Sequence, residues 1–156
     1  TLAPLFNFSI AFIFILVGRL VTDLLASINA FIGLIVIFTT PWMIIMMIGF
    51  FVRRGWYSPE DVQVFNKGKT GGIYWFNAGF NWRGLLAWIP SAILGLMFCY
   101  YPPLLIGPWS GVVGGIDVSL PVSIVSAAVL YVLFLSIWPE PKSAYGPKGS
   151  RLVRTK

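Results

Sequence analysis

Residues 24–54 have the sequence LLASINAFIGLIVIFTTPWMIIMMIGFFVRR, an uncharged apolar run that ends at two arginines. As one helix rising about 1.5 Å per residue, the run would be roughly 43 Å long, whereas the hydrocarbon core of a bilayer is about 30 Å thick. A run of this length and composition is typical of a transmembrane segment. We expect it to tilt, bend or break inside the membrane.

The rest of the chain has the same character. Hydrophobic residues make up 58% of the 156 residues and charged residues 10%, and the apolar residues come in long runs. Such runs exclude an ordinary soluble domain. The net charge of +6 does not indicate nucleic-acid binding, because the cations lie at the ends of apolar spans and form no stripe on a polar face. Cys99, the single cysteine, cannot build a disulfide framework or a metal cluster.

The apolar runs predict an all-α, polytopic membrane protein with about four transmembrane helices. We place the helices at residues 2–20, 24–52, 84–106 and 119–138, with a loop over 53–83 and a tail over 139–156. Within the loop, Ser58 and Pro59 followed by two acids predict the start of a short helix that continues to about residue 65.

Two basic clusters indicate the orientation. One precedes the last two predicted spans and the other follows them, and lysine and arginine stay preferentially on the cytoplasmic side of a bilayer. We therefore expect both clusters and the C-terminus to be cytoplasmic, in a multi-pass protein of the inner or plasma membrane, with Arg19, Asp23 and Asp117 on the outer side. The clusters are Arg53, Arg54, Lys67, Lys69 and Arg83, and Lys142, Lys148, Arg151, Arg154 and Lys156.

A break in the longest run is predicted near residues 39–41. Pro41 has no N–H to donate to the carbonyl of Ile37, and its ring crowds that turn. The hydroxyls of Thr39 and Thr40 are placed to satisfy the freed backbone groups. Such a proline is either structural or part of a moving element, and both interpretations stay open at this point.

Catalysis is not expected. The chain has no histidine, and none of its five acids lies in the middle of a predicted span. No nucleophile with a base, no pair of carboxylates and no metal-ligand cluster can be assembled, so we name no catalytic residue, no metal ligand and no cofactor. The glycine-rich segment 67–72 lacks the G-x-x-x-x-G-K-[ST] spacing of a phosphate-binding loop.

Short motifs follow one another from the end of the second span to the tail. They are TPW (40–42), GFFVRRGWY (49–57), D (61), FN (65–66), GIYW (72–75), NWRGL (81–85), AW (87–88), GP (107–108), GGID (114–117), SLPVS (119–123) and PEP (139–141). In this succession the chain resembles the nucleobase/cation symporter-1 family, the purine, cytosine, allantoin and hydantoin permeases. It departs from many members at Gly49-Phe50, where they have an Asp-Tyr or Asp-Phe pair.

The resemblance implies a twelve-helix carrier whose first ten helices form two inverted five-helix repeats. The four spans would be helices nine to twelve, a C-terminal fragment that packs against membrane lipid and the missing N-terminal helices of the same carrier. In the family, the nucleobase site lies on the first, third, sixth and eighth helices, and the cation site lies between the first and eighth. We therefore expect this segment to hold neither the substrate nor the coupling cation, Na⁺ or H⁺.

The same resemblance implies a gate. In the related hydantoin transporter the outer half of the tenth helix bends over bound substrate, and the proline register places the matching stretch at about residues 31–38. Leu34 and Ile35 are then the candidate outer-gate side chains, and Thr39, Thr40 and Pro41 are the candidate hinge. Ordinary packing against lipid or other helices explains these residues equally well.

The predicted function is that of the C-terminal portion of a secondary active transporter. Such a carrier takes up a nucleobase or related ring compound with a cation by alternating access. The alternative is a stand-alone four-helix membrane scaffold or accessory subunit without transport activity. The abrupt hydrophobic start at Thr1 favours the transporter.

Overall fold

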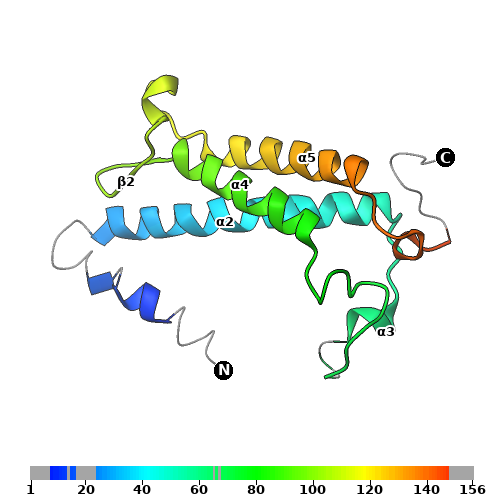
Figure 1. Cartoon of the computed structure of the whole chain (residues 1–156). Helices are drawn as coiled ribbons and strands as arrows, with labels where there is room; N and C mark the ends of the chain where they lie inside the picture. The colour runs from blue at the N-terminus through cyan, green and yellow to red at the C-terminus, as the bar shows by residue number, and fades with distance from the viewer. Residues whose placement is uncertain (1–7, 14, 17–23, 65, 67, 148–156) are drawn as a thin grey trace. The chain divides into compact units, whose positions relative to one another are not determined.

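The computed structural model describes residues 8–13, 15–16, 24–64, 66 and 68–147. These residues are mostly helical, and Figure 1 labels the long helices α2 (Leu24–Val52), α4 (Trp82–Met97) and α5 (Ser119–Ile137). Two compact units divide the chain: unit 1 is Thr1–Thr40 with Ala92–Ser123, and unit 2 is Pro41–Ser91 with Ile124–Lys156. Each long helix contributes residues to both units.

Helix α2 spans Leu24–Val52 and is continuous through Pro41, so the structure shows no interruption at the predicted break. The Thr39 hydroxyl donates to the carbonyl of Ile35 at 2.7 Å, rather than to the Ile37 carbonyl that Pro41 leaves without its helical donor. A hydroxyl bonded back to the preceding turn tends to bend a helix without ending it. Prolines are tolerated within membrane helices because serine and threonine hydroxyls, neighbouring helices and small backbone adjustments compensate for the lost hydrogen bond.

One buried stripe runs along each long helix. Its members recur every three or four positions, as expected for one face of a helix. Most of them are small, and small residues let membrane helices approach closely. The buried residues include Ser27, Ala30, Gly33, Ile37, Pro41, Ile45 and Gly49 on α2, Gly84, Ala87, Ser91, Ala92 and Gly95 on α4, and Ser119, Ser123, Ala127, Tyr131 and Leu135 on α5.

Two glycines in unit 1 show how close this packing is. A Cβ atom on Gly95 would clash with Ser123 Oγ and lie 3.0 Å from Ile37 Cγ2, and one on Gly33 would lie 2.5 Å from the ring of Tyr101. Contacts under 3.0 Å are essentially never made by real Cβ atoms. A larger residue at either position would therefore force the neighbouring side chains to shift.

Helix α4 spans Trp82–Met97, so it begins slightly before the predicted range and ends well before residue 106. The chain that follows folds back onto the end of the helix. The N–H of Trp109 donates to the Met97 carbonyl at 2.9 Å, and the N–H of Gly107 donates to the Cys99 carbonyl at 2.8 Å. Helix ends leave carbonyls without partners, and here the returning backbone supplies the donors. The sequence pattern showed an apolar run but could not show this reversal.

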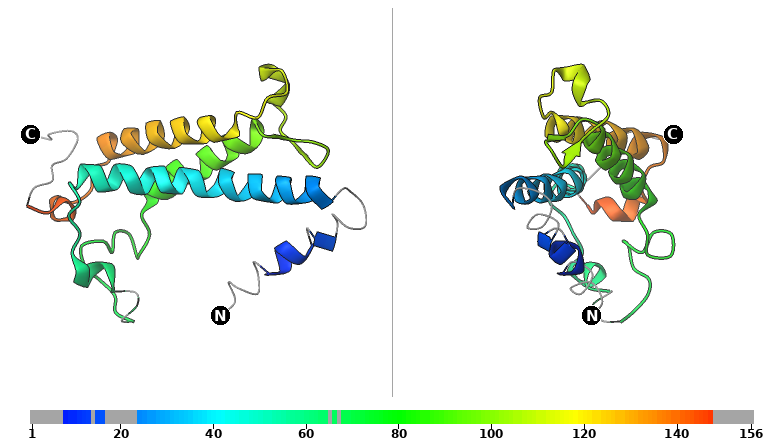
Figure 2. Two further views of the ribbon diagram at one scale, coloured as in Figure 1. Left: turned by 180° about the vertical axis from the view of Figure 1, so that it is seen from behind. Right: turned by 90° about the vertical axis from the view of Figure 1, so that its left-hand side faces the viewer.

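The reversal is a two-stranded antiparallel hairpin, β1 (Tyr100–Tyr101) and β2 (Leu105–Ile106), followed by the 3₁₀ helix η1 (Ser110–Val113) (Figure 2). Asp117 connects the hairpin to the next helix: Oδ2 accepts from the Tyr101 hydroxyl at 2.6 Å, and Oδ1 accepts from the Ser119 N–H at 3.1 Å. The second bond satisfies a backbone donor where α5 begins.

The segment between α2 and α4 is ordered by backbone caps. The end of α2 has the two hydrogen bonds of a Schellman motif, from the Gly55 N–H to the Phe50 carbonyl and from the Arg54 N–H to the Phe51 carbonyl, and Arg54 takes a φ of 52°. Helix α3 spans Pro59–Val62, and its N-cap is Ser58, as predicted, although the helix ends before residue 65.

Helix α5 spans Ser119–Ile137, close to the predicted 119–138. The first part of the predicted tail packs within unit 2. Ala144 and Tyr145, on the 3₁₀ helix η2 (Lys142–Tyr145), are buried, and a Cβ on Gly146 would clash with the Trp56 ring. Residues 148–156 lie outside the described residues.

Two of the described helices, α2 and α5, are long and apolar enough to cross a membrane, and α4 is a shorter apolar helix. The predicted span 2–20 is described only at residues 8–13 and 15–16, which are helical, and Arg19 and Asp23 also fall outside the described residues.

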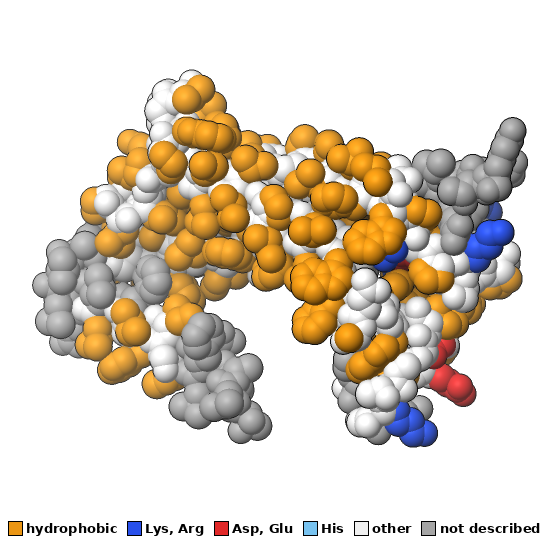
Figure 3. All heavy atoms as spheres, in the orientation of Figure 1, with side chains coloured by type: hydrophobic (Ala, Val, Ile, Leu, Met, Phe, Trp, Pro, Cys, Tyr) orange, Lys and Arg blue, Asp and Glu red, His pale blue; other side chains and the backbone are white. Residues whose placement is uncertain are grey.

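Large apolar side chains cover the outside of the long helices (Figure 3). Leu25 and Phe51 on α2 are 65% and 68% exposed, and Ile137 on α5 is 71% exposed. An exterior of this kind needs lipid or another apolar surface around it.

Gly95 gives a test of the close helix packing. We expect Gly95→Ala to lower the free energy of unfolding by about 1–3 kcal/mol, because the added methyl group overpacks the contact with Ser123. The matched control is Gly111→Ala, since a Cβ there meets no atom within 4 Å. The measurement is the temperature at which each detergent-purified variant loses its monodisperse peak in size-exclusion chromatography. Equal temperatures for the two variants would contradict the packing.

Candidate functional site

An ion pair between Arg53 and Glu140 lies buried in unit 2. Arg53 Nη2 donates to Glu140 Oε2 at 2.7 Å, and the two side chains are only 9% and 2% exposed. The amide of Asn81 donates to the other carboxylate oxygen, Oε1, at 3.4 Å. Taking both charges out of water costs several kcal/mol per ion, so the pair is stable only because each charge keeps its partner and its hydrogen bonds.

Two tyrosines pack around the guanidinium of Arg53. Its Cζ lies 5.3 Å from the ring centroid of Tyr57 and 5.5 Å from that of Tyr74, and Nη1 donates to the Tyr57 hydroxyl at 3.2 Å. Aromatic faces at this distance attract a cation. The Tyr74 hydroxyl in turn accepts from the Ser58 N–H at 3.2 Å, so the loop after α2 is folded around this arginine.

The pKa of Arg53 reflects these neighbours. Burial by itself lowers it, but the charge of Glu140 and the hydrogen bond with Tyr57 raise it further than burial lowers it. The net result is a pKa above the ordinary value for arginine. The guanidinium therefore stays charged, and the ion pair is not broken by deprotonation of Arg53.

A second buried arginine, Arg83, binds the end of α5. Its Nε donates to the carbonyl of Trp138 and its Nη2 to that of Pro139 at 3.1 Å, and its Cζ lies 4.7 Å from the Trp138 ring centroid. A cation favours the carbonyl end of a helix. Arg53 and Arg83 together therefore hold the segment that carries Glu140.

A cavity of about 280 Å³ in unit 2 borders the ion pair. Its lining includes Trp42, Gly49, Arg53, Phe80, Asn81 and Tyr131. Arg53 Nε, a buried donor, has no hydrogen-bond partner among the described residues. The cavity is thus mostly apolar, and Arg53 is the charged residue in its described lining.

The predicted gate and hinge residues lie together on α2, away from this polar cluster in sequence. Leu34 is half-buried and Ile35 is 46% exposed, while Pro41 is fully buried. Thr39 carries the back-bonded hydroxyl. The boundary between the two compact units in α2 falls between Thr40 and Pro41.

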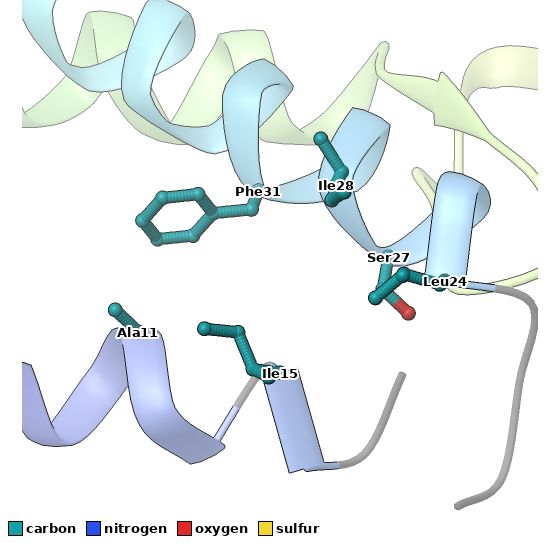
Figure 4. A pocket seen from close by; sticks show the side chains of 6 residues that line it. All are labelled: Ala11, Ile15, Leu24, Ser27, Ile28 and Phe31. Atoms are coloured by element: carbon teal, nitrogen blue, oxygen red, sulfur yellow. The ribbon is translucent and has the colours of Figure 1, made fainter. Parts of the chain in front are cut away.

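Unit 1 has a cavity of about 380 Å³ between the N-terminal helical residues and α2 (Figure 4). Ala11 and Ile15 point toward Ile28 and Phe31, and Leu24 and Ser27 complete the lining. Five of these six side chains are apolar. The cavity suits aliphatic groups and offers little that could recognise the polar edge of a ring compound.

Sequence reasoning missed the ion pair. It treated Arg53 as an orientation charge and as part of a motif, and it treated Pro139-Glu140-Pro141 as a motif at the start of the tail. The signal was present, because the predicted topology placed Glu140 on the same side of the membrane as both basic clusters. Which cation Glu140 would meet depended on the fold of the intervening loop.

Among the described residues, no group of three or more potential metal ligands comes together. The polar side chains of the cluster bind one another or backbone carbonyls, and none pairs a nucleophile with a base. Apolar helices of spanning length joined by such a cluster define a helical membrane protein whose described residues form no catalytic centre.

The family model for permeases for cytosine/purines, uracil, thiamine and allantoin matches residues 5–123. The match covers well over half of the chain, so the chain belongs to this family of transporters, which are not enzymes. Its place is in a membrane and its role is that of a permease for a nucleobase-type substrate. The family resemblance seen in the sequence is confirmed. No curated protein and no solved structure matches the chain.

The ion pair can be tested by removing one charge. We expect Glu140→Gln to lower the free energy of unfolding by about 3–5 kcal/mol, because Arg53 would remain charged and buried without its partner. Replacing both residues, as Arg53→Met with Glu140→Leu, should restore most of the loss. The readout is the thermal stability of the detergent-purified protein.

The control for this test is Arg54→Gln, next to the pair in sequence but on an exposed residue. It should leave the unfolding temperature nearly unchanged. If Glu140→Gln were as mild as Arg54→Gln, the pair would not hold this part of the fold together.

Proposed function

We propose that the chain is the C-terminal portion of a carrier that couples uptake of a nucleobase or related ring compound to a cation, Na⁺ or H⁺. The match to the permease family over residues 5–123 is the observation that carries this proposal. The spans of the chain correspond to helices nine to twelve, and alternating access moves the two repeats of the whole carrier against each other.

The chemistry of the described residues supports a substrate site elsewhere in the carrier. Recognition of a heterocycle needs several converging polar groups in one pocket. Here the buried Arg53 and Glu140 bind each other, the part-buried Asn81 binds Glu140, and the cavity near Phe31 is apolar. The segment therefore contributes packing and movement, while the absent helices supply the substrate and cation ligands.

The orientation in the proposal has the C-terminus in the cytoplasm of a multi-pass protein of the inner or plasma membrane. It is supported by the basic residues around the Arg53–Glu140 pair, since Arg53, Arg54 and Arg83 all lie in unit 2 with Lys142. Cations collect on the cytoplasmic side of short loops.

In this carrier the outer half of α2 is the gate. Ile35 and Leu34 close over the substrate, and the helix pivots at Thr39, Thr40 and Pro41. Two observations support a pivot: Pro41 removes a helical donor, and the Thr39 hydroxyl bonds back to Ile35. The Ile35 side chain is exposed, so it is free to contact substrate or another part of the carrier.

Transport can be measured on the whole carrier from which the chain comes. Cells that express it should accumulate radiolabelled cytosine, uracil, hypoxanthine or allantoin, and uptake should fall at least ten-fold either when Na⁺ is replaced or when a protonophore is added. Cells with the empty vector are the control. Absence of uptake for every compound would favour a membrane scaffold, and uptake that ignores both treatments would remove the cation from the proposal.

The gate is tested in the same assay. We expect Leu34→Ala and Ile35→Ala to raise the KM for the transported compound several-fold, because a truncated lid covers bound substrate less completely. Met43→Ala is the matched control, since Met43 is an apolar α2 residue, 61% exposed, on the other side of Pro41. Unchanged KM and unchanged ligand occlusion in both lid variants would assign these residues to ordinary packing.

A further inference from the structure

The segment over residues 106–116, which includes η1, carries its apolar side chains outward and its serine inward. Ser110 is buried, and its Oγ donates to the Gly107 carbonyl at 2.8 Å. Valine and isoleucine are usually buried in water-soluble proteins and serine is usually exposed, so this segment shows the reverse arrangement. The exposed fractions are 53% for Ile106, 42% for Trp109, 80% for Val112 and 65% for Ile116.

The backbone of the same segment makes most of its hydrogen bonds internally or with the end of α4. The N–H of Gly115 donates to the Ser110 carbonyl at 3.0 Å, and Pro108 has no N–H to satisfy. A backbone group that leaves water without a partner costs free energy, so a segment with paired donors can approach lipid at a lower cost. The other paired N–H groups are those of Gly107, Trp109, Ser110, Val112 and Gly114.

The segment joins two apolar helices, α4 and α5, and the sequence contains no charged residue between positions 84 and 116. In Figures 1 and 2, η1, drawn yellow-green, projects sideways from the end of α4 and the start of α5, across the direction of the helix axes. Apolar side chains lie on this projection as they do on the helices (Figure 3). An element that leaves a membrane helix sideways runs along the membrane instead of away from it.

Trp109 is held in place at the base of the projection. Its ring meets that of Phe98 edge to face with the centroids 5.4 Å apart, and its N–H donates to the Met97 carbonyl at 2.9 Å. Tryptophan is enriched at the headgroup level of membranes, where its ring lies between lipid and water. Residues 106–116 bear no charge, and their one hydroxyl is already bonded. The polar rim that protein interfaces use is therefore absent from this described segment, and lipid is the better match.

We propose that residues 106–116 insert into one leaflet of the bilayer at the junction of α4 and α5. Val112 and Ile116 reach the boundary between headgroups and acyl chains, and Trp109 lies at headgroup level. The partner is the lipid surface itself, and no particular headgroup is selected because the segment has no charge. The proposal uses the membrane location of the chain and is independent of the compound that the carrier transports.

The test places a nitroxide spin label at Val112→Cys in the whole carrier, reconstituted in vesicles of dioleoylphosphatidylcholine and dioleoylphosphatidylglycerol. Electron paramagnetic resonance then measures collisions of the label with oxygen, which concentrates in lipid, and with nickel ethylenediaminediacetate, which stays in water. The matched control is Lys69→Cys, an exposed position in the loop between α2 and α4. We expect the oxygen-to-nickel collision ratio to be roughly ten-fold higher at Val112 than at Lys69. The unsubstituted carrier, labelled in parallel, gives the background.

A second position, Ile116→Cys, covers the case in which the Val112 variant does not fold, and it should give the same ratio. A ratio as low as that of Lys69 would place the segment in water and overturn the proposal. An immobilised label that neither reagent reaches would also overturn it, and would assign this surface to a protein contact with another part of the carrier.

Discussion

The burial of the Arg53–Glu140 ion pair is the constraint on which unit 2 depends. Two opposite charges can leave water together only if their geometry is good and most of their remaining hydrogen bonds are made, and Tyr57 and Asn81 supply two of these bonds. This requirement brings the end of α2, the residues before α4 and the segment after α5 to one place. Arg83 acts in the same direction through the carbonyls of Trp138 and Pro139.

The apolar parts of the helices follow a different rule. In lipid the hydrophobic effect does not drive helices together, so close contact between small residues must do so. Gly95 and Gly33 show this in unit 1, where a Cβ atom would force the neighbouring side chains to shift. A membrane also requires that backbone carbonyls at a helix end find hydrogen-bond donors. At the end of α4, the backbone that returns from the hairpin supplies these donors.

Membership of the permease family gives these features a context. A carrier needs rigid bodies that keep their shape and elements that move between them. The polar cluster around Glu140 suits a rigid body, and a helix that stays continuous across Pro41 while losing a backbone hydrogen bond suits a movable element. The family match ends at residue 123, yet Glu140 lies beyond it and is a member of the buried pair.

The sequence by itself determined the membrane class, the two longest described helices, the Ser58 cap and the family, because length, apolar composition and short motifs are local properties of the chain. It misplaced the end of α4 and missed the partner of Glu140. Only the tertiary structure decided these, because the Gly107 and Trp109 donors and the Arg53 charge reach their partners from distant parts of the sequence. The apolar composition of a run predicts that it can be buried, whereas contacts between polar groups depend on how distant segments fold together.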